Sequence, residues 1–332
     1  LHLSLRRQRQ MCIRDRLRKI LLSLSNKESK NFYYKNALFL INPVAGKLPI
    51  KKKITLINNV IKNYKSEILI TRSPEESAQR TKEAMLDNRL VVACGGDGLQ
   101  NIVAEQAVNT GGTMAVFPMG RGNDFAASLK IHNSKDLETS LSSNIIHKAR
   151  YLNVEFEGYK KICLTCAGVG LLSEAAFRAS RIPILKGSLL YAIATLISFI
   201  NLQNHGYKLL MNGERKDQSF LIIAGAASPY TGGGMYIAPD AFKEETNVNL
   251  LSAKKVSRLQ AVKLLSQVFS GAHIHNKNVI NSHINEFEIL TESKNSWAKL
   301  VYGDGEFLGN LPVKISIGRD PLNVLVPSLK IK

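Results

Sequence analysis

The sequence predicts an α/β lobe built on a parallel sheet, followed by a second lobe that is mostly antiparallel β. Apolar runs typical of buried strands alternate with helical patterns as far as about residue 130. Three of these runs end in loops that contain Gly and Asn. After about residue 150 the pattern changes to short β-rich runs separated by turns. A chain of 332 residues is long enough to bury a core in each lobe.

Two helices and several strands of the first lobe can be assigned from their patterns. Residues 50–64 carry apolar side chains at helical spacing. Helix 74–87 has a clear start signal, with Ser73 as N-cap, Pro74 at the first position and Glu76 closing a capping box. The predicted strands are 38–41, 67–71, 90–93 and 116–117.

The most informative loop is Cys94-Gly95-Gly96-Asp97-Gly98, which joins strand 90–93 to a helix that includes residues 101–108. Glycines at this point let backbone N–H groups approach a ligand, and the helix behind them presents its positive dipole end. The pattern is typical of a phosphate cradle. A carboxylate facing phosphate needs a divalent cation between them or a proton, so Asp97 points to phosphoryl transfer.

Two further loops are expected at the same edge of the sheet. Residues 42–47 (Asn-Pro-Val-Ala-Gly-Lys) follow strand 38–41, and residues 118–126 follow strand 116–117. The carboxyl ends of parallel strands line one crevice, so the three loops are predicted to surround one ligand.

These motifs resemble the catalytic domain of the diacylglycerol kinase family, which includes sphingosine and ceramide kinases and bacterial lipid kinases. The resemblance rests on Asn-Pro-x-Ala-Gly from Asn42, Gly-Gly-Asp-Gly-x-x-Asn from Gly95 and Pro-x-Gly-x-x-Asn-Asp-Phe-Ala from Pro118, in that order. It extends to Glu306. It implies a fold like that of NAD kinases and diacylglycerol kinases. It also implies an ATP-dependent lipid kinase that phosphorylates the hydroxyl of a membrane lipid alcohol, with diacylglycerol as the first candidate.

The resemblance also implies which residues bind the nucleotide. Asp97 is expected to reach Mg²⁺ beside ATP, and Thr71 matches a position whose threonine contacts the nucleotide. A solvated strand-end threonine is an equal alternative. The complete predicted ATP-binding set is Asn42, Gly46, Thr71, Gly95, Gly96, Asp97, Gly98, Asn101, Gly120, Arg121 and Asn123.

Acidic residues near the end of the second lobe complete the predicted catalytic site. Asp304-Gly305-Glu306 lies on a predicted hairpin turn, and in the family this motif carries the group proposed to activate the acceptor hydroxyl. An alcohol near pH 7 is a poor nucleophile, so a carboxylate must accept its proton. Asp304 and Glu306 are the two candidates for this base, and Asp97, through its expected contact with Mg²⁺, completes the predicted catalytic residues. The glycine-rich stretch 230–241 also matches the family and would border the cleft.

The chain departs from the family pattern at several positions. Leu99 and Arg121 each replace a threonine, and Leu172 stands where an aspartate is expected. Glu245-Thr246 replaces the Asp-Gly near which bacterial members hold a structural Mg²⁺, so Glu245 is a weak metal candidate. These changes keep open a catalytically inactive lipid- or nucleotide-sensing homologue, and a NAD kinase-like enzyme is a further alternative. No G-x-G-x-x-G follows the first strand, which argues against a dinucleotide-binding enzyme.

The net charge of +19 indicates an anionic partner. No nucleic-acid-binding module is recognisable, so we expect an anionic membrane surface and no nucleic acid. Four cysteines are too few for a disulfide framework, which favours a cytoplasmic protein attached peripherally to the membrane. Cys163 and Cys166 lie on one predicted strand, 162–167, where side chains three positions apart point to opposite faces. We therefore do not expect this pair to bind zinc. The oligomeric state stays open, a homodimer included.

The predicted domain organisation has four parts. The apolar run 184–202 is expected to form a globular helix, with core packing favoured over a lipid access route. Residues 1–30 hold nine Lys or Arg against two acidic residues. The segment 1–34 is expected to be disordered, with a membrane-contacting helix as the alternative. The parts are a basic extension (1–34), a nucleotide-binding α/β domain (35–149), a β-rich lipid-substrate domain (150–318) and a C-terminal segment (319–332) that can return to the first domain.

Overall fold

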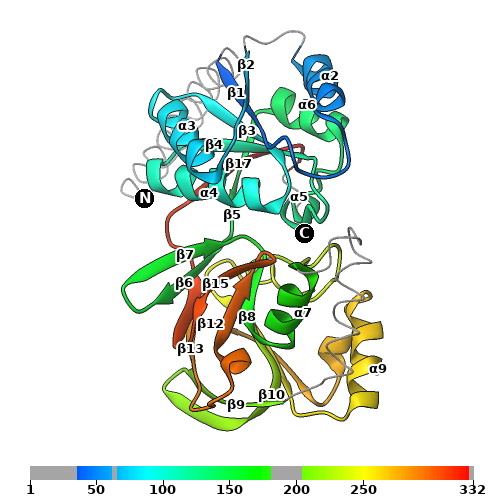
Figure 1. The fold of residues 1–332 in the computed structure, drawn as a ribbon, viewed down its shortest axis with the longest axis vertical. Helices are drawn as coiled ribbons and strands as arrows, with labels where there is room; N and C mark the ends of the chain where they lie inside the picture. Colours follow the sequence, from blue (N-terminus) through cyan, green and yellow to red (C-terminus); the bar gives the residue numbers. More distant parts are fainter. Residues whose placement is uncertain (1–35, 62–65, 181–203, 329–332) are drawn as a thin grey trace, which may run out of the picture.

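The computed structural model describes residues 36–61, 66–180 and 204–328. They form two lobes stacked along the long axis of the molecule (Figure 1). The predicted fold class is confirmed: a mostly parallel sheet, sheet A, builds the first lobe and an antiparallel sheet, sheet B, builds the second. The predicted extension 1–34 and the apolar run 184–202 lie outside the described residues.

Sheet A has six strands in the order β2-β1-β3-β4-β17-β5. All neighbours pair in parallel except β5, which runs antiparallel to β17. The strands are β1 (Ala37–Ile41), β2 (Ser66–Ile70), β3 (Leu90–Gly95), β4 (Thr113–Pro118), β5 (Ile145–Ala149) and β17 (Leu322–Val326).

Helices cover both faces of sheet A because successive side chains of each strand point to opposite faces. On β1, Leu38 and Leu40 pack towards α3 and α4, whereas Phe39 and Ile41 pack towards α2 and α6. The helices are α2 (Ile50–Val60), α3 (Pro74–Leu86), α4 (Asp97–Thr110), α5 (Asp124–Ser128) and α6 (Ser134–Ser143).

The start of α3 follows the prediction except in one bond. The hydroxyl of Ser73 accepts a hydrogen bond from the backbone N–H of Glu76 over 3.1 Å. The Glu76 carboxylate returns to the backbone N–H of Arg72 at 2.7 Å instead of closing the capping box on Ser73. Both bonds still satisfy amide groups at the entrance to the helix.

Sheet B has eleven strands, and every pairing in it is antiparallel among the residues that the structure describes. Helices α7 (Leu171–Ser180) and α9 (Arg258–Val268) and the short 3-10 helices η1 (Ala272–His275) and η2 (Ser296–Lys299) accompany it. The strands are β6 (Leu152–Phe156), β7 (Tyr159–Cys163), β8 (Cys166–Gly170), β9 (His205–Met211), β10 (Glu214–Ala226), β11 (Val248–Lys254), β12 (Val279–Ile284), β13 (Glu286–Leu290), β14 (Leu300–Gly303), β15 (Glu306–Asn310) and β16 (Val313–Ile317).

The prediction of one continuous strand over 162–167 is wrong. Strand β7 ends at Cys163 and β8 begins at Cys166. The backbone N–H groups of Leu164 and Thr165 donate to the carboxylate of Asp304 instead of joining a strand ladder. A long-range contact therefore interrupts an apolar run that, taken locally, favours a strand.

The chain crosses between the lobes twice, after β5 and after β16. The second crossing places β17 between β4 and β5 in sheet A, where Leu322, Val324, Leu325 and Val326 are fully buried. The last strand of the chain is therefore an interior part of the first lobe.

We expect Leu325→Ala to lower the free energy of unfolding by about 2–5 kcal/mol, because the Leu325 side chain has no solvent exposure and its truncation leaves a cavity in the core. Urea denaturation followed by circular dichroism measures the change. The control is Leu86→Ala on α3, whose side chain is 62% exposed and should change stability by at most about 0.5 kcal/mol. Equal effects of the two substitutions would contradict an interior role for β17.

Candidate functional site

The three predicted loops meet at the carboxyl edge of sheet A, and glycines allow them to touch. A Cβ added to Gly120 would lie 2.2 Å from Cα of Gly96. A Cβ on Gly46 would lie 2.2 Å from the carbonyl oxygen of Met119, and Gly46 also has a positive φ of +64°. The backbones of the loops thus pack directly against one another, which no residue with a side chain would permit.

A buried lysine that the sequence analysis did not identify holds the first of these loops. Lys53 on α2 has no solvent exposure, and its Nζ donates to the carbonyl oxygens of Asn42 and Pro43 at 2.9 and 3.0 Å. Burial lowers the pKa of this ammonium group. In the sequence Lys53 is one of three consecutive lysines at the start of an amphipathic helix, and nothing local distinguishes it from its neighbours.

Asp97 lies at the first position of α4, which begins earlier than the helical pattern from Asn101 predicts, and one of its oxygens is left without a partner. Oδ2 accepts a hydrogen bond from the backbone N–H of Asn123 at 2.8 Å, whereas Oδ1 is buried and has no hydrogen-bond partner. Burial first, and then the carboxylates of Asp124 and Asp304, raise the pKa of Asp97 to about 7. The unpaired oxygen is suited to hold a proton or a cation.

Asp124 is a second buried carboxylate that the prediction did not assign to the site. Its oxygens accept hydrogen bonds from the backbone N–H groups of Gly233 and Gly234 at 2.8 and 2.7 Å. Burial raises its pKa, and the two N–H donors oppose that shift. The bonds tie the glycine-rich loop of the second lobe to the first lobe. Asp124 directly follows Asn123 in the motif that begins at Pro118, and this position could have identified it as a site residue.

Asp304 and Gly305 form the two-residue turn between β14 and β15, with φ angles of 51° and 80°. Two positive φ angles are what a type I′ hairpin turn requires, and Asp-Gly supplies them. The carboxylate of Asp304 accepts four hydrogen bonds, which occupy about the whole acceptor capacity of a carboxylate. The donors are Leu164 N (2.7 Å), Thr165 N (2.9 Å), Thr165 Oγ1 (2.7 Å) and Asn101 Nδ2 (2.9 Å).

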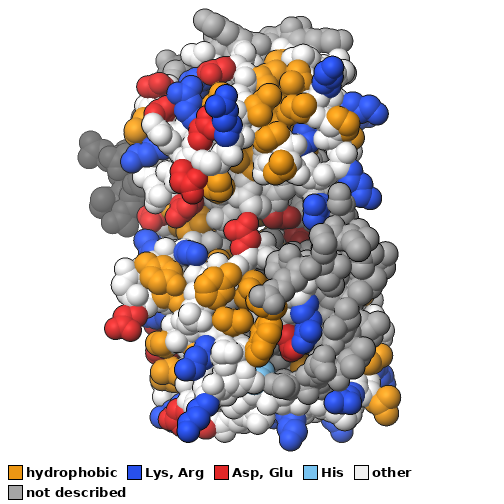
Figure 2. All heavy atoms as spheres, in the orientation of Figure 1, with side chains coloured by type: hydrophobic (Ala, Val, Ile, Leu, Met, Phe, Trp, Pro, Cys, Tyr) orange, Lys and Arg blue, Asp and Glu red, His pale blue; other side chains and the backbone are white. Residues whose placement is uncertain are grey.

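The structure brings Glu306 to the start of α4 as well. A Cβ added to Gly98 would lie 2.9 Å from its Oε1. Partial desolvation first and the charge of Asp304 second raise the pKa of Glu306, while Lys161 opposes them. The acidic pair of the hairpin and Asp97 therefore share one junction between the lobes, and Figure 2 shows acidic side chains at that junction.

Several predicted nucleotide-binding residues make internal contacts. The Thr71 hydroxyl is buried and bonds the carbonyl of Ile41 and the hydroxyl of Ser77. Asn101 bridges α4 to Asp304 and to the carbonyl of Ile162, and Asn123 closes its own loop on Gly120. The hydrogen bonds of these side chains hold the loops in place.

The two departures in the loops differ in placement. Leu99 is buried at 3% exposure beneath the glycine loop, so it fills the position of the expected threonine with apolar packing. Arg121 is an exposed residue of the loop that follows β4.

The metal candidate Glu245 lies apart from the acidic cluster. It is exposed, and its charge acts on His147 and on Arg150, whose pKa is lowered to about 10 chiefly by burial. Basic neighbours disfavour a cation there. Among the described residues no group of three His, Cys, Asp or Glu side chains is arranged to hold a metal alone. A cation at Asp97 would need further ligands from a nucleotide and water, which is the usual way Mg²⁺ is held.

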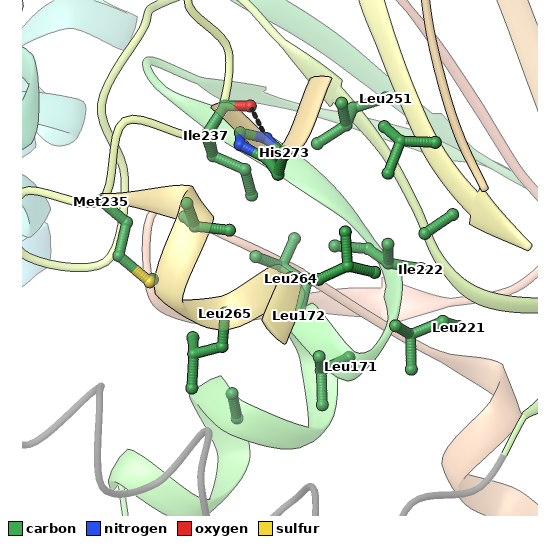
Figure 3. Close-up of a pocket in the computed structure, with 14 residues that line it drawn as sticks. Leu171, Leu172, Leu221, Ile222, Met235, Ile237, Leu251, Leu264, Leu265 and His273 are labelled. Carbon is green, nitrogen blue, oxygen red and sulfur yellow. Dashed lines mark hydrogen bonds between the residues drawn. The ribbon is translucent and has the colours of Figure 1, made fainter. Parts of the chain in front are cut away.

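Two neighbouring hollows, lined largely by apolar side chains, lie in the second lobe next to Asp304. A small hollow beside the hairpin is lined by Asp304, Thr231, Leu172, Ala175 and Met235, among others. Leu172, Ala175 and Met235 also line a larger hollow between α7, α9, β10 and β11, with about 660 Å³ of empty space that is partly open to solvent. Figure 3 shows leucine and isoleucine side chains from these elements around it, together with Met235 from the glycine-rich loop and with His273 hydrogen-bonded to the carbonyl of Ile237.

We expect Asp97→Asn to raise the free energy of unfolding at pH 8 by on the order of 1–3 kcal/mol. With its pKa raised from 3.8 to about 7, the folded protein keeps a proton on Asp97 that the unfolded chain releases. This group therefore makes stability fall as pH rises from about 4 to 7. Denaturation of parent and variant at pH 5 and pH 8 measures the difference.

The control for that experiment is Asp87→Asn, because the Asp87 carboxylate is exposed to solvent. Parallel pH profiles for the parent and the Asp97→Asn protein would contradict a desolvated carboxylate at the start of α4.

Comparisons with known proteins agree with this architecture. The model of the diacylglycerol kinase catalytic domain matches residues 36–154, and the model of the YegS C-terminal NAD kinase beta sandwich-like domain matches residues 165–326. No helix in the described ranges is both long enough and apolar enough to cross a bilayer.

Individual relatives are similar over 71% to 90% of the chain. A diacylglycerol kinase of Bacillus subtilis (strain 168) is 23% identical over 89% of this chain and 98% of its own length. One of Mycobacterium tuberculosis (strain CDC 1551 / Oshkosh) is 28% identical over 71% of this chain and 76% of its own. A crystal structure of a diacylglycerol kinase from Bacillus anthracis str. Sterne has a TM-score of 0.65 at 14% identity, over 90% of this chain and 99% of that one. With both lobes matched in order, the chain belongs to the diacylglycerol kinase catalytic-domain family.

Proposed function

We propose that this protein transfers the γ-phosphoryl group of ATP to the hydroxyl of a membrane lipid alcohol, with diacylglycerol as the first acceptor to test. One observation carries the proposal. Asp304 lies between the glycine loops of sheet A and an apolar hollow in the second lobe. A carboxylate placed between a phosphate-type cradle and an apolar site fits a reaction that joins a polyphosphate to a lipid hydroxyl.

The glycine loops would hold the triphosphate. The N–H groups at the start of α4 face the ligand with the positive end of the helix dipole behind them. The unpaired Oδ1 of Asp97 is the atom that would contact Mg²⁺, whose role when bound is to neutralise charge on the phosphates. Asp97 would then be fully ionised, since a neighbouring cation lowers a carboxylate pKa.

Asp304 is the proposed general base. Its Oδ1 accepts from the hydroxyl of Thr165, which also lies 3.2 Å from the hydroxyl of Thr231. Rotation of the Thr165 hydroxyl towards Thr231 frees a lone pair on Asp304 for the acceptor hydroxyl. The acceptor oxygen then forms its bond to the γ-phosphorus, its proton passes to Asp304, and the bond to the β-γ bridging oxygen breaks to release ADP.

The three other donors to Asp304 position this base. Two of them are backbone N–H groups, which cannot rotate away, and the third is the side chain of Asn101. They hold the carboxylate in place while one donor exchanges. Positioning of this kind is what a phosphoryl transfer depends on besides charge neutralisation.

The apolar hollow would receive a hydrocarbon chain of the acceptor. Apart from His273 its lining consists of apolar side chains, which suits a hydrocarbon chain. Leu172 stands where the family pattern has a carboxylate, in the small hollow beside Asp304. Small and apolar residues such as Ala175 line much of the rest of that hollow. An acceptor without a positive charge near its hydroxyl fits this lining.

We expect Asp304→Asn to lower the rate of ATP-dependent phosphorylation of diacylglycerol by about a hundredfold or more, because an amide cannot accept the proton. Incorporation of γ-phosphate label into lipid measures the rate. Asp87→Asn, which alters an exposed carboxylate remote from the hairpin, is the control. Full activity of the Asp304→Asn protein would overturn its assignment as the base. ATP or lipid binding without turnover in the parent would favour the sensing alternative.

We expect Ala175→Trp to raise KM for long-chain diacylglycerol about tenfold or more while leaving KM for ATP unchanged. Ala175 lines both hollows and is 7% exposed, so the indole would take up space where the two adjoin. The matched comparison is a short-chain acceptor assayed with the same variant, whose KM should change less. Equal losses for both acceptors would contradict a chain-binding role for the larger hollow.

A further inference from the structure

Helix α9 lies on the outer side of the second lobe (Figure 1), and apolar side chains on one of its faces are exposed to solvent. Leu259 is 86% exposed, Val262 is 46% exposed, and Phe269, just after the helix, is 48% exposed. Spacings of three and seven residues put all three on one side. The opposite side of the helix is anchored in the lobe by Ala261 and Leu264. A surface leucine so far out of the fold contributes nothing to the core of the lobe.

The charged residues that precede, form and follow this helix in the sequence are all basic. Residues 246–285 contain five Lys or Arg and no Asp or Glu. Lys254, Lys255, Arg258 and Lys263 are all exposed on α9 or next to it. An apolar centre with a positive rim matches the interface of an anionic bilayer, where acyl chains accept the apolar side chains and headgroups attract the charges. A nucleic acid would use the charges and leave the apolar centre in water.

The same helix also forms a wall of the apolar hollow. Leu264, Leu265 and Val268 line it, and it shares lining residues with the small hollow that contains Asp304. Figure 3 shows Leu264 and Leu265 pointing from their helix into this space. One face of α9 thus points to solvent while the other borders the site proposed for the hydrocarbon chain. A bilayer seated on α9 would lie next to that hollow.

We propose that α9 is the membrane-docking helix of this protein and that it lies in the interface of an anionic bilayer, beside the hollow that takes up the lipid chain. The uptake of a chain rests on the proposed function, whereas the docking itself does not. The helix would insert Leu259, Val262 and Phe269 among the acyl chains, with Lys255 and Lys263 among the headgroups.

The test measures co-sedimentation of the full chain with vesicles of phosphatidylglycerol and phosphatidylcholine in equal parts, and of phosphatidylcholine alone. Leu259→Gln combined with Val262→Gln should weaken binding to the mixed vesicles by about tenfold or more. Lys255→Gln combined with Lys263→Gln should weaken it by about fivefold for each charge and reduce the preference for the anionic lipid. The matched controls on α3 are Leu86→Gln, at 62% exposure, and Lys82→Gln, which should bind as the parent does.

A second readout separates docking from catalysis. Activity on a water-soluble short-chain diacylglycerol should be unchanged in all four variants, because none of these side chains touches the acidic site. Loss of vesicle binding with no measurable kinase activity in the parent would leave docking supported and the proposed function rejected.

Two results would overturn the proposal. One is vesicle binding by both α9 variants that equals that of the parent. The other is concentration-dependent self-association of the parent in analytical ultracentrifugation that the Leu259 and Val262 substitutions abolish, since the face would then contact a second copy of the chain.

Discussion

The arrangement of the site depends on the four hydrogen bonds that the carboxylate of Asp304 accepts. Three come from the turn between β7 and β8, and the fourth comes from Asn101 on α4 of the first lobe. One side chain therefore connects the hairpin of β14 and β15, the neighbouring turn of sheet B and the first lobe. Asp304 is partly buried, and withdrawing a carboxylate from water is costly unless hydrogen bonds replace the lost water, as these four do. It also explains why an apolar segment that favours a strand is broken at Leu164 and Thr165.

Around this contact the carboxylates of Asp97, Asp124 and Asp304 lie close together, and their mutual repulsion lowers the stability of the fold. Burial and mutual repulsion raise the pKa values of Asp97 and Asp124, and only Asp124 and Asp304 have their oxygens fully engaged. The unpaired Oδ1 of Asp97 is the one position in this cluster, among the described residues, where the folded protein leaves a buried acceptor unsatisfied. Clusters of this kind are typical of functional sites, because a cation or proton supplied by the reaction completes them.

The sequence predicted much of this site because its motifs are local. Gly96, Asp97 and Gly120 sit in loops whose turn chemistry can be recognised without tertiary structure, and Asp304-Gly305 is a two-residue turn signal. What local patterns could not give were side chains whose roles arise from burial. Lys53 looks like its two lysine neighbours until it is enclosed. Thr71 forms its bonds within the first lobe, and Asn101 bonds Asp304 only where the two lobes pack together.

By itself the sequence determined the alternation of strands and helices in the first lobe, the β-rich character of the second, and the acidic and glycine-rich motifs, since periodicity and turn chemistry act over a few residues. Only the tertiary structure decided that β17 lies inside sheet A, that Asp124 binds the glycine-rich loop of the other lobe, and that the Asp304 carboxylate stands beside an apolar hollow. These facts depend on contacts between residues more than a hundred positions apart, and local patterns carry no information about such partners.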